Sequence, residues 1–151
     1  MALKYSLVAA LAVASFATAG IAQAKTVEID MLNKDETGSM VFHPALVRAE
    51  PGDQIVFKAV AKIHMVKSIN TMAPDGVKPV VGAMGADTTV TLTKEGVYGF
   101  ECLPHYGMGM VALVVVGKPV NEAAAKDATA TVPSMAKARF TKLFAQLDAN
   151  P

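Results

Sequence analysis

The stretch from Cys102 to Met110, which reads Cys-Leu-Pro-His-Tyr-Gly-Met-Gly-Met, brings a thiol, an imidazole and a thioether close together in the chain. It holds the only cysteine and one of the three histidines, His105. Thiolate, imidazole and thioether are soft or borderline ligands, which suit copper far better than calcium, magnesium or manganese. This stretch therefore predicts a mononuclear copper site.

Such a site needs a second imidazole. His64 is the best candidate, because it follows an alternating β pattern in a distant part of the chain. Two imidazoles and a thiolate form a trigonal ligand set, and a thioether completes it as a weak axial ligand. The predicted ligands of this blue copper site, which suits one-electron transfer, are His64, Cys102, His105 and Met110.

The elements around the motif explain its spacing. A strand expected over 97–101 ends just before Cys102, so that the thiolate lies at one end of a β-sheet. Pro104 stiffens the following loop and removes a backbone donor. The glycines that precede Met110 let the chain reverse and bring the thioether beneath the site.

Each of these residues, taken singly, has another explanation. Cys102 fits a buried structural thiol, and Met110 fits a residue that fills a gap in the core. His64 and His105 fit ordinary histidines at a strand edge or in a surface loop. The same ligand set also binds zinc. The third histidine, His43, has no comparable companions in the sequence and is expected at the surface.

The dominant period of the chain is two, which is the period of β-strands. Residues 33–38 resemble a turn, and residues 71–87 are rich in glycine and proline and are expected to be irregular. Seven or eight short strands separated by turns predict an all-β sandwich or barrel. The strands are expected at 27–32, 40–42, 46–49, 55–60, 66–69, 88–93, 97–101 and 111–116.

The character of the chain changes after residue 117. An alanine-rich segment predicts a short helix over 121–127, with Asn121 as its N-cap. A second helix is expected over about 134–147, and it should pack on the sandwich, because it carries an apolar stripe formed by Phe140, Leu143, Phe144 and Leu147. We therefore expect one domain, with the β-sandwich over 25–117 and a helical tail over 118–151.

The amino terminus has the pattern of a secretory signal peptide over residues 1–24. Lys4 precedes an apolar run over 7–19, and Ala22-Gln23-Ala24 forms a small-residue cleavage site. The apolar run is too short for a membrane-spanning helix, so membrane insertion is not expected. The mature chain should begin at Lys25 and reach the bacterial periplasm.

Charge and cysteine content exclude several classes of protein. The net charge is close to zero and no basic stripe is present, so nucleic acid is not an expected partner. An exported chain with one cysteine cannot form an internal disulfide, and its thiol would be open to oxidation. Binding a metal removes that problem for Cys102.

The chain resembles the pseudoazurins, bacterial periplasmic members of the cupredoxin family. The matching stretches are Met31-Leu-Asn-Lys34, Met40-Val-Phe42, Pro51-Gly-Asp53, Gly96-Val-Tyr-Gly99 and, most specifically, Pro104-His-Tyr-Gly-Met-Gly-Met110. The resemblance implies a Greek-key cupredoxin sandwich and one copper ion per chain, bound by the four ligands predicted above. It also implies that His105 presents its ring edge as the electron port, with Met40 and Met108 on an apolar patch around it.

The chain departs from the family pattern beside the ligands. The family usually places glycine before the first histidine and asparagine after it, where this chain has Ile63 and Met65. Leu103 replaces the threonine that usually follows the cysteine. Because polar groups near a metal tune it, we expect an intact site with a changed reduction potential, raised by the more apolar surroundings.

The resemblance implies a monomer that exchanges electrons with other proteins, such as a copper nitrite reductase, a c-type cytochrome or another periplasmic oxidoreductase. Lys34 and Lys62 match family lysines that attract acidic partners, but Glu101 replaces a usual lysine. Attraction of an acidic partner should therefore be weaker and less sensitive to salt. A periplasmic copper-binding or delivery protein is the alternative function. An enzyme is not expected, because four protein ligands leave no open position for a substrate.

Overall fold

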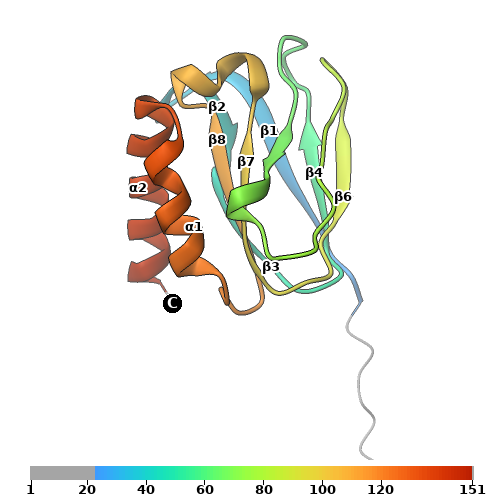
Figure 1. Cartoon of the computed structure of the whole chain (residues 1–151). Helices are drawn as coiled ribbons and strands as arrows, with labels where there is room; N and C mark the ends of the chain where they lie inside the picture. The colour runs from blue at the N-terminus through green and yellow to red at the C-terminus, as the bar shows by residue number, and fades with distance from the viewer. Residues whose placement is uncertain (1–22, 151) are drawn as a thin grey trace, which may run out of the picture.

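The protein consists of two four-stranded sheets packed face to face (Figure 1). The structure, a computed structural model, describes residues 23–150, so nearly all of the predicted signal peptide (1–24) lies outside the described residues. The first sheet has the order β2-β1-β4-β6, and the second has the order β3-β8-β7-β5. The strands are β1 (Thr26–Asp35), β2 (Gly38–His43), β3 (Leu46–Ala49), β4 (Gln54–Lys58), β5 (Lys67–Ile69), β6 (Thr88–Thr91), β7 (Gly96–Glu101) and β8 (Val111–Val116). The predicted β-sandwich with a helical extension is confirmed.

The core between the sheets is apolar and aromatic. The ring of Phe57 lies at its centre, 5.7 Å from the ring of Phe42 and 4.8 Å from the ring of Phe100. Cys102 and Met110 belong to the same buried cluster, at the end of the sandwich where β7 stops and β8 begins. Two of the predicted ligands, Cys102 and Met110, therefore border an apolar core.

Strand β8 is buried on both faces, because the helices cover the outer face of its sheet (Figure 1). Alternate residues of β8 point into the core between the sheets, and the others face α2 (Ser134–Ala149), while α1 (Glu122–Ala128) packs beside them on β7. The stripe Phe140, Leu143, Phe144 and Leu147 is buried in this second cluster. The prediction that the second helix packs on the sandwich is confirmed.

The predicted turn over 33–38 was wrong at its start, because β1 continues to Asp35. The carboxylate of Asp35 accepts hydrogen bonds from the backbone N–H groups of Thr37, at 2.7 Å, and Gly38, at 3.2 Å. These bonds close a tight hairpin, so Asn33 and Lys34 stay in the strand. The other predicted strands agree with the observed ones except at their end residues.

Asn121 precedes α1 as predicted, but its side chain does not cap the helix. Its amide oxygen instead accepts from the backbone N–H of Val97, at 2.6 Å, and its amide nitrogen donates to the carbonyl of Val97, at 3.0 Å. This pair of bonds ties the start of the helical tail to β7, which no local pattern indicates.

Three short 3-10 turns complete the described chain: η1 (Asn70–Met72), η2 (Leu103–Met108) and η3 (Thr129–Thr131). The first lies at the start of the segment predicted to be irregular, and the second forms the loop that carries His105. Within residues 23–150, no helix has the length and apolar character needed to cross a membrane.

Candidate metal centre

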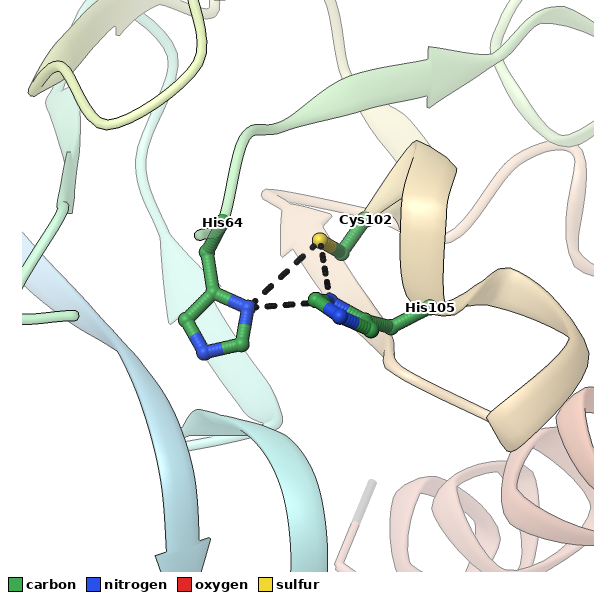
Figure 2. A group of neighbouring side chains, drawn as sticks. All are labelled: His64, Cys102 and His105. Carbon is green, nitrogen blue, oxygen red and sulfur yellow. Dashed lines mark hydrogen bonds between the residues drawn. The ribbon is translucent and has the colours of Figure 1, made fainter. Parts of the chain in front are cut away.

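Three side chains from two distant parts of the chain converge at one end of the sandwich (Figure 2). His64 lies between β4 and β5, in the loop that crosses from the first sheet to the second. Cys102 follows the last residue of β7, and His105 lies in η2. The fold therefore brings together three of the four predicted ligands, and their donor atoms lie within 4.8 Å of one another.

The loop after Cys102 is held by its own backbone. The N–H of Cys102 donates to the carbonyl of Met110, at 3.0 Å, and the N–H of His105 donates to the carbonyl of Cys102, at 2.9 Å. The N–H of Met110 donates to the carbonyl of His105, at 3.1 Å. Gly109 ends η2 with a φ of +83°, a left-handed conformation that glycine adopts without strain. The predicted reversal of the chain before Met110 is confirmed.

The donor atoms form a triangle that fits a metal ion. The Nδ1 atoms of His64 and His105 are 3.1 Å apart, and the sulfur of Cys102 lies 3.7 Å from the first and 3.4 Å from the second. The centre of a triangle with these sides is about 2.0 Å from each corner, which is close to the usual metal–imidazole distance and somewhat shorter than a metal–thiolate bond. Two imidazoles and a thiolate around one point are also the trigonal set of blue copper sites.

His64 is fully buried, and a side chain of β1 orients its ring. Its Nε2 lies 2.9 Å from the amide oxygen of Asn33. Since that oxygen only accepts hydrogen bonds, Nε2 carries the proton and Nδ1 presents its lone pair to the site. The amino-acid sequence predicted no role for Asn33. The feature that could have indicated a role is its position within a strand, where asparagine is disfavoured.

The four predicted ligands differ in exposure. His105 is only partly buried, whereas Cys102 and His64 are fully buried. Met110 is also fully buried, and its main chain is bonded to both Cys102 and His105. The site therefore has a closed interior, and His105 is the one predicted ligand that is partly exposed.

Burial sets the charge states around this centre. It raises the pKa of the Cys102 thiol, although the backbone N–H groups of Met65 and His105 point at the sulfur and oppose that shift. Burial, followed by the neighbouring His105, lowers the pKa of His64. Both effects favour neutral groups without a metal, so metal binding must displace the thiol proton.

The residues that depart from the family pattern lie at the surface of the site. The side chains of Ile63 and Leu103 are 49% and 51% exposed. Met65 is partly buried, and its backbone N–H faces the Cys102 sulfur.

Glu101, which stands where the family usually has lysine, is not a free surface charge. Its side chain is buried, and its carboxylate lies 3.3 Å from the Nζ of Lys67, the residue opposite it on β5. The carboxylate also lies near Tyr106, whose pKa is raised to about 12 by burial and, secondarily, by the charge of Glu101. The ammonium of Lys67 thus neutralises much of the negative charge that Glu101 would otherwise add near the site.

His43 lies at the surface, as predicted, but it does have companions. Its Nδ1 is 3.0 Å from the carboxylate of Asp35, and Glu36 completes a group whose ligand atoms lie within 4.8 Å of one another. The sequence pattern missed this group because β1 and β2 bring it together across the hairpin.

Comparison with known proteins agrees with this geometry. Residues 29–117 match the family of copper binding proteins described as the plastocyanin/azurin family. The chain belongs to this cupredoxin family. It is 47% identical to a pseudoazurin of Paracoccus pantotrophus over 141 residues, which are 93% of this chain and 96% of that protein.

Solved structures of cupredoxins agree as well. The crystal structure of a pseudoazurin from Methylobacterium extorquens AM1 is 50% identical, has a TM-score of 0.77, and is matched over 81% of this chain and 98% of its own. The crystal structure of a pseudoazurin from Hyphomicrobium denitrificans is 40% identical, has a TM-score of 0.72, and is matched over 80% of this chain and 97% of its own. The predicted resemblance to pseudoazurins and the prediction of copper as the cofactor of a blue copper protein are confirmed.

Proposed function

We propose that this cupredoxin is a periplasmic one-electron carrier that holds a single copper ion with His64, Cys102, His105 and Met110. The observation that carries the proposal is the triangle of two imidazole nitrogens and one sulfur at the closed end of a β-sandwich. Copper supplies the one-electron couple between Cu(II) and Cu(I). The protein supplies a fixed donor set.

The donor atoms are fixed because each belongs to a restrained segment. Asn33 orients the ring of His64, and three backbone hydrogen bonds fix the loop from Cys102 to Met110. A ligand set that moves little when the oxidation state changes keeps the reorganisation energy of electron transfer small. Four protein ligands also leave no position for a substrate, which favours a carrier over an enzyme.

His105 is the route by which an electron enters and leaves. It is the partly exposed member of the three residues in Figure 2, whereas His64 and Cys102 are fully buried. Exposed apolar side chains occur in both ligand-bearing loops, namely Ile63, Leu103 and Met108. An apolar surface with a partly exposed ligand at the end of the sandwich fits short-lived docking of a redox protein, such as a copper nitrite reductase or a c-type cytochrome.

The decisive experiment adds one equivalent of Cu(II) to the purified chain lacking residues 1–24, beside a Cys102→Ser variant. We expect an intense thiolate-to-copper absorption band and the narrow EPR splitting of a blue copper site, both lost in the variant. Absence of the band in the unsubstituted protein would contradict the proposed ligand set.

A second measurement separates an electron carrier from a copper delivery protein. A carrier should release copper slowly to an external chelator in either oxidation state, and should pass electrons quickly to a soluble redox protein. Rapid transfer of the ion itself to an acceptor would favour delivery. Fractionation of the cells of origin, followed by sequencing of the amino terminus, tests export and cleavage before Lys25.

A further inference from the structure

One pair of residues is missing from the ladder between β1 and β2. The two strands pair in a constant register, with Leu32 opposite Val41 and Lys34 opposite Ser39. The intervening pair, Asn33 and Met40, is not formed. The ladder therefore opens at the residue whose side chain bonds to His64.

The cause of this gap is the backbone of Met40. Its φ is +51°, and among residues 23–150 it is the one residue other than glycine with a positive φ. A side chain with a Cβ adopts this left-handed conformation at a cost, and it persists where the surroundings hold it. Something must therefore hold Met40.

The residue that holds Met40 comes from the other end of the chain. The guanidinium of Arg139, on α2, donates from Nη1 to the carbonyl of Met40 and from Nη2 to the carbonyl of Ser39, both at 2.7 Å. The planar fork of arginine suits two adjacent acceptors, and a lysine ammonium cannot reproduce it. The bond to Met40 is partly buried, whereas the bond to Ser39 is exposed.

The same helix also supports the other ligand-bearing loop. A Cβ at Gly109 would lie 2.9 Å from the carbonyl oxygen of Met135, so the backbone of η2 rests closely on the start of α2. Figure 1 shows the start of α2 beside the loop between β7 and β8. One helix thus contacts both the loop that carries His105 and the strand that pairs with β1, which carries Asn33.

We propose that Arg139 is a positioning residue for the metal centre: it locks Met40 in the left-handed conformation that keeps the ladder open, and so holds Asn33 against the ring of His64. If Met40 relaxed to an extended conformation, the missing pair could form, and the backbone of Asn33 would be drawn toward β2 and away from His64. This inference uses His64 as a ligand and to that extent rests on the proposed function. The contact between Asn33 and His64 itself does not depend on a metal.

The first test uses the metal-free protein. Nitrogen-15 NMR of the histidine rings follows the Nε2 proton of His64, which should exchange slowly because Asn33 and burial protect it. In Arg139→Gln we expect this proton to exchange several-fold faster, and the Asn33 amide signals to shift. The matched control is Lys142→Gln, which removes the same charge from an exposed position of the same helix and should leave both signals unchanged.

Two further variants separate positioning from simple loss of stability. Arg139→Lys keeps the charge but loses the fork, so it should resemble Arg139→Gln if positioning is the role. Met40→Gly removes the conformational cost at position 40, so the effect of Arg139→Gln should be smaller in that background. If Arg139→Gln does not fold, the comparison of Arg139→Lys with the unsubstituted protein carries the test.

The copper-loaded protein gives an independent measurement. Loss of ligand orientation should weaken copper binding about tenfold in Arg139→Gln, with a changed EPR splitting, while Lys142→Gln stays unchanged. Unaltered His64 exchange and unaltered EPR in a folded Arg139→Gln would overturn the inference. A failure to bind copper in the unsubstituted protein would instead overturn the proposed function, while leaving the metal-free comparison interpretable.

Discussion

The amide oxygen of Asn33 accepts a hydrogen bond from Nε2 of His64, at 2.9 Å. This bond connects β1 to the loop that crosses from the first sheet to the second. The bond settles which ring nitrogen of His64 faces the site. It also makes the orientation of a buried imidazole depend on a residue that is itself exposed. Asn33 is therefore the most direct target for mutation outside the ligands.

Replacing Asn33 with alanine should weaken copper binding about tenfold, because partners that orient ligating imidazoles usually contribute 10- to 100-fold, roughly, and water can reach this exposed position. Competition with a chelator of known affinity measures the change. Lys34→Ala, on the exposed neighbour in the same strand, is the control. Equal affinities for the two variants would contradict the orienting role.

The apolar residues beside the ligands should raise the reduction potential. The double variant Met65→Asn and Leu103→Thr restores the polar groups usual in relatives, so its potential should fall by tens of millivolts, where about 59 mV corresponds to a tenfold change in a one-electron equilibrium. Protein-film voltammetry measures both proteins. A potential in the unsubstituted protein at or below that of other pseudoazurins would disprove the expectation.

Two glycines of the ligand loop should respond very differently to substitution. Gly109→Ala introduces a Cβ at a φ of +83°, 2.9 Å from the carbonyl of Met135, whereas a Cβ at Gly107 meets nothing within 4 Å. We expect Gly109→Ala to lower the free energy of unfolding by about 1–3 kcal/mol and Gly107→Ala to change it little. Urea denaturation of the metal-free proteins distinguishes them, and similar losses would show that the close approach to α2 is unimportant.

Asp53 should make the stability of the protein depend on acid pH. Hydrogen bonds from the backbone N–H groups of Glu50 and Lys25 lower the pKa of its carboxyl below the usual 3.8. A lowered folded pKa means that the unfolded chain binds more protons, so this stability is present above the usual value and is lost as pH falls through the folded pKa. The stability difference between the unsubstituted protein and Asp53→Asn, measured by urea denaturation, should be constant near neutral pH and shrink as the pH falls below the usual pKa of 3.8.

Cleavage before Lys25 should strengthen this contact. The backbone nitrogen of Lys25 lies 2.7 Å from the carboxylate of Asp53. In the cleaved chain this nitrogen is a charged ammonium, and charge-assisted hydrogen bonds are stronger. Acetylation of the new amino terminus should therefore reduce the effect of Asp53→Asn, whereas equal effects in both forms would argue against the ion pair.

Docking with an acidic redox partner should depend only weakly on salt. Lys34 and Lys62 are exposed, but Lys67 is paired with the buried Glu101, and the surface around His105 includes Ile63 and Leu103. The second-order rate of electron transfer, measured by stopped flow at low and high salt, should fall less than for a pseudoazurin with lysine at the position of Glu101. An equally steep fall would contradict this.

The amino-acid sequence by itself determined the part of the site that is local in the chain. The types and spacing of Cys102, His105 and Met110 predicted a copper loop at the end of a strand, and the structure shows that loop as a 3-10 turn closed by Gly109. Period-two alternation located the strands, and the apolar stripe of α2 predicted its packing. Each of these features depends on residues within about a dozen positions of one another, because the regular geometry of a strand or helix fixes which of those residues share a face.

Only the tertiary structure decided which distant residues hold that site in place. Asn33, Met40 and Arg139 lie far apart in the chain, and each looks ordinary until the register of β1 and β2 and the position of α2 place them together. The same holds for the bonds between Asn121 and Val97 and for the pairing of Glu101 with Lys67. The physical reason is that a hydrogen bond or ion pair across elements depends on register and packing angle, which arise from the burial of the whole core rather than from any local pattern.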